Sequence, residues 1–186
     1  MIATARAVVP EAVMPPHPGL ALRDTKRGKA LYSRTGHAAG ETLLEHYGPR
    51  ESFAVGAQVA PDHVMEVGED EVFLPSGGLD DYVNHSCQPN CRLDYQSQGR
   101  VFLVALRDIA AGEELSFDYA TTTTRDGIAA FPGWRFTCLC GADGCRGEVG
   151  CAEDLPADRL RYYLQIGALA PHVVARVAKI ASARAA

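Results

Sequence analysis

Residues 84–90 read Asn-His-Ser-Cys-Gln-Pro-Asn, and together with two later segments they decide the fold of this chain. Residues 113–119 read Glu-Glu-Leu-Ser-Phe-Asp-Tyr, and residues 138–147 contain the spacing Cys-x-Cys-x4-Cys-Arg-Gly. The first segment offers amide, imidazole and thiol groups on a turn, the second ends a predicted strand with a tyrosine, and the third clusters thiols. These side chains indicate a ligand pocket and a metal site.

The composition is that of one ordinary globular domain, because 47% of the 186 residues are hydrophobic and 22% are charged. Acidic residues outnumber basic ones by 23 to 18, and the net charge of −5 argues against a direct nucleic-acid partner and suits a basic peptide or protein. The longest apolar run, residues 101–106, is far shorter than the ~20 residues that cross a bilayer, so we predict no membrane span. We expect a cytoplasmic protein, although the sequence leaves a nuclear destination or secretion as an effector open.

Short strands joined by irregular loops are predicted for most of the chain. Four prolines between positions 10 and 18 predict an extended N-terminal arm, which we extend to residues 1–27. Strand-forming runs follow at residues 30–32, 42–47, 53–60, 63–67, 72–74, 91–95, 101–106 and 115–119. The runs at 30–32 and 42–47 are joined by a turn, those at 91–95 and 101–106 form a hairpin, and a threonine-rich loop starts at residue 120.

The C-terminus changes to helical periodicity. Pro156 suits a helix start, and Gly167 separates this helix from a second one that starts at Pro171. The residues that share one face are Leu160, Tyr163 and Leu164 in the first helix, and Val173, Val174, Val177 and Ile180 in the second. These helices either pack on a β core, which is the simpler use, or mediate a homodimer.

Clustered thiols indicate a metal site rather than disulfides. Three of the six cysteines lie within residues 138–145, and a disulfide between Cys138 and Cys140 would be badly strained. A tetrahedral zinc site needs a fourth ligand besides Cys138, Cys140 and Cys145. The candidates for it are Cys87, which is favoured by its polar turn, Cys91 and Cys151. The alternative is a set of free buried cysteines.

Single residues in the other two segments have simpler explanations. Tyr119 taken alone would be a core tyrosine with a satisfied hydroxyl group, and His85 and Asn84 would be turn residues. The three segments in their order, however, resemble the SET-domain protein lysine methyltransferases with a post-SET zinc segment. The resemblance covers residues 28–147, and residues 43–48, Leu-Leu-Glu-His-Tyr-Gly, take the place of a strand in the opening segment of that family.

The resemblance implies a fold that is mainly β with some α, in which small sheets surround a pseudoknot. It divides the chain into the arm at 1–27, a SET domain at 28–119, a post-SET segment at 120–152 and C-terminal helices at 153–186. S-adenosylmethionine and a lysine of a protein or peptide substrate would enter from opposite faces and meet in a narrow channel.

The resemblance also implies roles for individual residues. The cofactor would contact Asn84, His85, Tyr119, Phe136 and Leu139, and the backbone of Lys29 and Ala30. Ala30 replaces the second glycine of the family's Gly-x-Gly, and its methyl group could crowd the cofactor. Tyr119 would be the catalytic tyrosine and Tyr47 a catalytic residue that lines the lysine channel. Phe117 would also contact the substrate, at a position where phenylalanine in the family goes with the addition of more than one methyl group. Zinc would be bound by Cys87, Cys138, Cys140 and Cys145.

The chemistry suits these groups, because a lysine amine with a pKa of ~10.4 must lose its proton before it attacks a methyl carbon. Apolar walls and a neighbouring sulfonium charge both disfavour the ammonium form. Most of the catalysis would then be positioning by Tyr119. Two rival functions remain: a non-catalytic peptide-binding module with the same fold, and a methyltransferase that acts on a small molecule. Asn84, His85 and Tyr119 together argue against the first rival.

Overall fold

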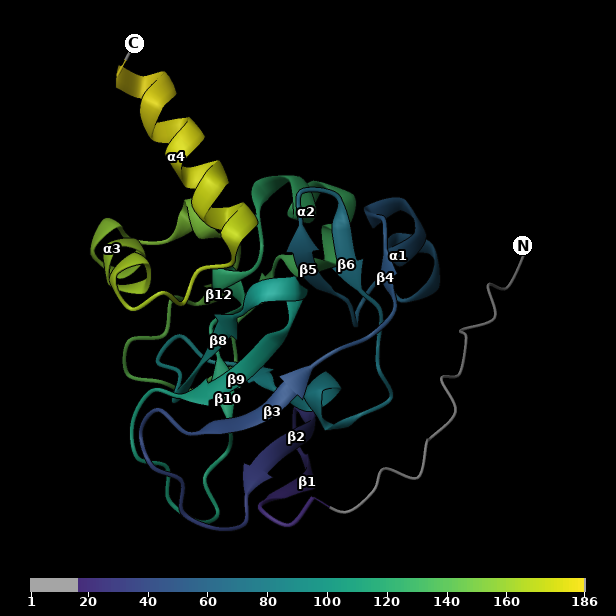
Figure 1. The fold of residues 1–186 in the computed structure, drawn as a ribbon, viewed down its shortest axis with the longest axis vertical. Coiled ribbons are helices and arrows are strands. Elements are labelled where there is room, and N and C mark those ends of the chain that lie inside the picture. The colour runs from purple at the N-terminus through teal and green to yellow at the C-terminus, as the bar shows by residue number, and fades with distance from the viewer. Residues whose placement is uncertain (1–16, 186) are drawn as a thin grey trace.

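The computed structural model describes residues 17–185, in which twelve strands form five small sheets (Figure 1). The hairpins are β1 (Leu20–Thr25) with β2 (Gly28–Ser33), and β11 (Phe136–Thr137) with β12 (Glu148–Val149). The three-stranded sheets are β3 (Thr42–His46), β9 (Val101–Ala105) and β8 (Cys91–Tyr95), and β4 (Arg50–Glu51), β6 (Glu71–Phe73) and β5 (Met65–Gly68). A parallel pair joins β7 (Asn84–His85) to β10 (Ser116–Phe117). This confirms the mainly β architecture.

Four α-helices complete the described chain, namely α1 (Phe53–Val59), α2 (Arg125–Ala130), α3 (Ala157–Gln165) and α4 (Pro171–Ala185). The C-terminal pair was predicted with its breaks near Pro156 and Gly167, and Gly167 has the positive φ of 64° that favours glycine after a helix. In Figure 1 the first turns of α4 lie against the body and its last turns project away from it. None of the helices between residues 17 and 185 has the length and apolar character needed to span a bilayer.

The predicted N-terminal arm ends earlier than residue 27. Leu20–Thr25 is a strand that pairs with β2 along its whole length, from Leu20 opposite Ser33 to Thr25 opposite Gly28. Leu20 is buried in the core, which gives this strand an apolar anchor. The strand at residues 30–32 was predicted correctly, but β2 pairs with β1, whereas β3 pairs with β9 in another sheet. Three of the four prolines of the predicted arm, Pro10, Pro15 and Pro16, lie outside the described residues, and Pro18 lies within them.

The predicted strand at residues 53–60 is wrong, because this segment forms α1. The side chain of Ser52 caps the helix by accepting a hydrogen bond from the Val55 amide at 3.4 Å. Phe53 and Gly56 lie one turn apart and are both buried. A side chain at Gly56 would meet Val72 at 2.8 Å, so glycine is needed for close packing rather than for a strand. A second helix, α2, interrupts the predicted threonine-rich loop and is capped by Thr124.

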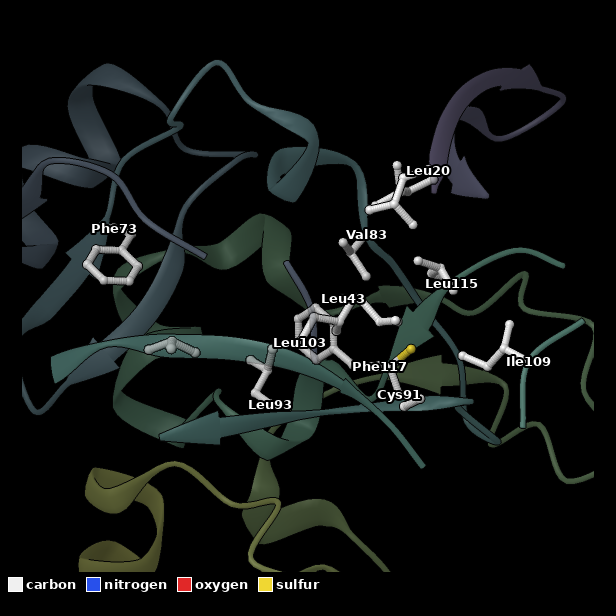
Figure 2. Packing of buried hydrophobic residues seen from close by; sticks show 13 residues of the cluster. Leu20, Leu43, Phe73, Val83, Cys91, Leu93, Leu103, Ile109, Leu115 and Phe117 are labelled. Atoms are coloured by element: carbon white, nitrogen blue, oxygen red, sulfur yellow. The ribbon is translucent and has the colours of Figure 1, made fainter. Parts of the chain in front are cut away.

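The main core lies between the sheet β3-β9-β8, the hairpin β1-β2 and the strand β10 (Figure 2). The predicted hairpin 91–95/101–106 is confirmed as β8 and β9, in which Leu93 faces Leu103. Both leucines are fully buried, and each stabilises the fold by roughly 1.5–3 kcal/mol. A second cluster contains Ala120, Tyr163, Ala170 and Val173. The C-terminal helices therefore pack on the β core through part of their predicted face, while Val174 is 40% exposed.

Candidate functional site

The parallel pair β7–β10 places the first two sequence segments side by side. Asn84 lies opposite Ser116 and His85 opposite Phe117. Asn90 secures this arrangement, because its Oδ1 accepts from the Ser116 amide at 2.9 Å and its Nδ2 donates to the Glu114 carbonyl at 2.8 Å. The two asparagines of the first segment thus both contact the second segment.

Glu114 orients the Asn84 amide. Asn84 Nδ2 donates to Glu114 Oε1 at 3.1 Å and to the Lys29 carbonyl at 3.2 Å. The other carboxylate oxygen accepts from Arg27 at 2.8 Å and from Tyr32 at 3.3 Å. Neither Glu114 nor Arg27 was predicted to act in the site, and the only signal for Glu114 in the sequence is its place in the acidic pair Glu113-Glu114.

His85 connects the turn to both the tyrosine and the cysteines. Burial lowers the pKa of this imidazole to about 4, although Asp118 opposes the shift, so the ring is neutral at neutral pH. Its Nδ1 accepts from the Tyr119 amide at 3.2 Å, which places the ring proton on Nε2. Nε2 then faces Cys87 Sγ at 3.3 Å and can donate to that sulfur.

Tyr119 keeps its phenolic proton. Burial raises the pKa of its hydroxyl group to about 12, and the negative charge of Glu114 adds to the shift. The hydroxyl group donates to the Val83 carbonyl at 3.0 Å. The ring lies 5.0 Å from that of Phe117 and 5.4 Å from that of His85, measured between centroids. Tyr119 can therefore orient a polar group but cannot act as an anionic base at neutral pH.

Two cavities meet in this region. The first has a volume of about 140 Å³, and its lining includes Tyr47, Phe117 and Tyr119. The second has a volume of about 200 Å³, and its lining includes Asn84, His85 and Leu139. Phe136 and Val149 belong to the lining of both cavities and face each other as a pair of the β11–β12 hairpin. One cross-strand pair therefore lies at the border of both cavities.

The remaining predicted site residues are placed as follows. Tyr47 is 54% exposed at the first cavity, and Leu139 is 68% exposed at the second. Lys29 and Ala30 line neither cavity, although the Lys29 carbonyl binds Asn84. Ala30 is 0% exposed, so its methyl group is enclosed by protein atoms and projects into neither cavity. The crowding of a bound cofactor by Ala30 stays a prediction.

The charge around the first cavity is acidic. Its lining contains four acidic residues and neither lysine nor arginine; the acidic residues are Asp62, Glu66, Asp80 and Asp81. Asp80 and Asp81 are bound within their own loop, since Asp80 accepts from Ser76 and Asp81 accepts from the amides of Ser76 and Gly77. Asp62, Asp80 and Asp81 suit a cationic ligand, although burial raises the pKa of Asp80 and raises that of Glu66 to about 7.

Four cysteines form a candidate metal site. The sulfur atoms of Cys87, Cys138, Cys140 and Cys145 all lie within 4.8 Å of one another, and those of Cys87 and Cys138 are 3.7 Å apart. A tetrahedral zinc site with Zn–S bonds of ~2.3 Å has sulfur atoms ~3.8 Å apart. The four thiols form no disulfide and fit this geometry. Among the three candidates for the fourth position, the structure brings Cys87 to the cluster.

The other two candidates are occupied elsewhere. Cys91 contacts Asn90 Oδ1 at 3.5 Å, and Cys151 donates to Asp154 at 3.1 Å. The Arg146 amide points at Cys87 Sγ at 3.4 Å, as expected for a donor that stabilises a metal-bound thiolate. Cys87 thus connects the turn at residues 84–90 to the cysteine loop.

The family model of the SET domain matches residues 19–120, which is more than half of the chain. The fold, the β7–β10 pair and this match place the chain in the SET-domain family. The match begins at the β1–β2 hairpin, in agreement with the early end of the N-terminal arm.

Several relatives of this chain are named as histone-lysine N-methyltransferases. The chain is 33% identical over 131 residues to the H3 lysine-4 specific histone-lysine N-methyltransferase of Saccharomyces cerevisiae, covering 63% of this chain and 12% of that protein. It is 29% identical to the protein of the same name from Candida albicans, and the match covers 64% of this chain and 12% of that protein. The chain therefore corresponds to a small part of these relatives.

A solved structure with a similar fold is that of KRYPTONITE in complex with mCHH DNA, H3(1-15) peptide and SAH. It superposes with a TM-score of 0.57 at 25% identity, covering 70% of this chain and 29% of that one. KRYPTONITE bound to mCHG DNA and SAH superposes with the same TM-score, 0.57.

Proposed function

We propose that this chain is an S-adenosylmethionine-dependent methyltransferase that acts on the ε-amine of a protein lysine. The observation that carries the proposal is the meeting of two cavities at the Phe136–Val149 pair, with Asn84 and His85 on one side and Tyr119 on the other. Membership of the SET-domain family supports it.

The second cavity is the cofactor side in this proposal. Asn84 is held by Glu114, and the Asn84–His85 strand borders the cavity together with Phe136 and Leu139. Bound S-adenosylmethionine supplies an electrophilic methyl group. The backbone of Lys29 and Ala30 would border the cofactor next to Asn84, whose amide already binds the Lys29 carbonyl.

The first cavity receives the lysine. Its lining includes the apolar side chains of Phe117 and Val83, which disfavour an ammonium ion and promote loss of its proton. Tyr119, which stays protonated, orients the neutral amine toward the second cavity through its hydroxyl oxygen. Tyr47 at the entrance contacts the aliphatic part of the lysine. The rate gain in this scheme comes mainly from alignment of the two reacting groups.

Zinc, bound by Cys87, Cys138, Cys140 and Cys145, holds the loop that carries Leu139 next to the second cavity. Hydrogen bonds from Arg27 to the Leu139 carbonyl at 3.3 Å and from the Cys138 amide to the Gly147 carbonyl at 2.9 Å support the same loop. The residues at 120–152 act as a post-SET segment in this proposal. The SET domain in this proposal comprises residues 28–119 together with the rest of the β1–β2 hairpin, and the C-terminal helices comprise residues 153–186.

The substrate is a lysine in a basic protein segment, such as a histone tail. The acidic lining of the first cavity and the histone specificity of the named relatives support this choice. A histone acceptor would require a location with chromatin, whereas the cytoplasmic location predicted from the sequence stays a prediction. The same holds for the expected absence of direct nucleic-acid binding and for a homodimer through the C-terminal helices.

The test is cofactor binding by calorimetry with zinc-loaded protein, followed by transfer of labelled methyl groups to histones and lysate proteins. Tyr119→Phe should bind the cofactor and lose most of the transfer rate, while Tyr162→Phe, at an exposed position on α3, should leave both unchanged. Absence of cofactor binding would reject the enzyme. Binding with no acceptor would favour the peptide-binding module, and transfer to small molecules alone would favour the other rival function.

A further inference from the structure

Asp118, the residue before Tyr119, lies at the centre of a buried network. Its two carboxylate oxygens each accept a hydrogen bond from Arg146 at 2.7 Å, in a bidentate arrangement. Tyr163 of α3 donates its hydroxyl proton to Asp118 Oδ2 at 2.9 Å. The Asp118 side chain is 0% exposed. This carboxylate therefore joins the cysteine loop, α3 and the 3-10 helix Tyr119–Thr121, which Asp118 caps.

A run of four threonines extends this network on the other side of Tyr119. The Tyr119 carbonyl accepts hydrogen bonds from the hydroxyl groups of Thr122 and Thr123, both at 3.1 Å. It also accepts from the amides of the same two residues, at 3.1 and 3.2 Å. The backbone of Tyr119 is therefore fixed by the side chains that follow it.

The threonine run is in turn held by the C-terminal segment. The Ala170 amide donates to the Thr121 carbonyl at 2.9 Å, and the Ala152 amide donates to the Thr123 carbonyl at 2.9 Å. His172 Nε2 lies 2.7 Å from the Thr122 carbonyl, so this nitrogen carries the ring proton. Three successive carbonyl groups are thus bound by residues beyond the matched SET domain, which ends at residue 120.

From these contacts we infer that the C-terminal helices position Tyr119 for methyl transfer, and that Tyr163 is a positioning residue which acts through Asp118. This inference rests on the proposed function. Tyr163 lines neither cavity and is 1% exposed, so its effect would pass through Asp118, which is joined to Tyr119 by a peptide bond and lies 3.5 Å from His85 Nδ1. Purely structural packing, the alternative, would need only the ring of Tyr163 in the second core cluster.

The test uses Tyr163→Phe, which removes the hydroxyl group and keeps the buried ring. We expect kcat to fall about tenfold, since a hydrogen bond to a charged group is lost, while the cofactor Kd and the zinc content stay unchanged. Amide hydrogen exchange of residues 119–124 should be about tenfold faster, because this segment, which begins with the 3-10 helix Tyr119–Thr121, opens more often. Tyr162→Phe is the matched control. Tyr162 is 43% exposed, and its replacement should change neither kcat nor the hydrogen exchange of residues 119–124.

A normal kcat for Tyr163→Phe at a temperature well below its unfolding transition, with unchanged exchange at residues 119–124, would overturn the inference and leave Tyr163 a packing residue. Should this variant not fold, Thr122→Val removes the hydroxyl group that binds the Tyr119 carbonyl, and Thr122→Ser should restore both kcat and slow exchange. Failure of Thr122→Ser to restore them would also overturn it. If the wild-type protein transfers no methyl group, the proposed function fails, whereas the exchange measurement still decides whether the helices hold residues 119–124.

Discussion

Glu66 should make the protein less stable as the pH rises through neutrality. Its carboxyl group is 1% exposed, and burial raises its pKa from 4.5 to about 7, although hydrogen bonds from the Thr124 hydroxyl group at 2.6 Å and amide at 2.9 Å oppose the shift. Glu153 and Asp126 add to the shift, and His172 lies 3.4 Å away. The folded state therefore holds a proton that the unfolded chain releases near pH 4.5.

The size and sign of this effect follow from linkage. Because the folded pKa is the higher one, the contribution of Glu66 to the free energy of unfolding is complete below pH 4.5, decreases as the pH rises, and is absent above the folded pKa of about 7. With these two pKa values, it falls by about 2–3 kcal/mol between pH 5 and pH 8. Glu66→Gln has the same shape, can bind both groups of Thr124 and does not titrate.

The assay is urea denaturation of both proteins at pH 5 and pH 8. The free energy of unfolding of the wild-type protein should fall by about 2–3 kcal/mol more than that of Glu66→Gln, because the contributions of groups that do not interact with Glu66 cancel in the difference. The m-values should match. Equal changes in the two proteins, or a larger fall for Glu66→Gln, would show that Glu66 is ionised in the folded state near its ordinary pKa.

Three further predictions concern the site. Cys140→Ser should lose the one zinc ion per chain, whereas Cys91→Ser should keep it; metal analysis that finds no zinc in the wild-type protein would reject the site. Glu114→Gln should weaken cofactor binding about tenfold in calorimetry, since Arg27 and Asn84 lose a charged acceptor, and an unchanged Kd would contradict this. Mass spectrometry should find more than one methyl group on a lysine, and only one after Phe117→Tyr. Monomethylated product from both proteins would refute it.

Local signals predicted the elements whose stability is local. The β8–β9 hairpin follows from two strand-forming runs around a turn, and the C-terminal helices follow from periodicity and the break at Gly167. The helix α1 was missed because its apolar face consists of Phe53 and a glycine, so the pattern contains no periodicity to detect. The need for Gly56 arises from its contact with Val72, which is distant in the sequence.

The candidate site divides in the same way. The three segments identified Asn84, His85, Tyr119 and the cysteines, because amide, imidazole, phenol and thiol groups are visible as residue types. The supporting residues Glu114 and Asp118 were quoted without a role, since a carboxylate at a strand end is usually solvated. Only the fold shows that Asp118 meets Arg146 and Tyr163 at 2.7–2.9 Å. Contacts between residues that are distant in the sequence produce no regular spacing from which they could be predicted.

The Phe136–Val149 pair has a mechanical consequence. Both residues belong to a two-residue hairpin whose enclosed loop contains three of the four clustered cysteines. This hairpin has few hydrogen bonds of its own, so the metal would hold in place the hairpin that lies between the two cavities. Removal of the metal by a chelator should then join the two cavities into one open groove. The cofactor site and the lysine site would be lost together.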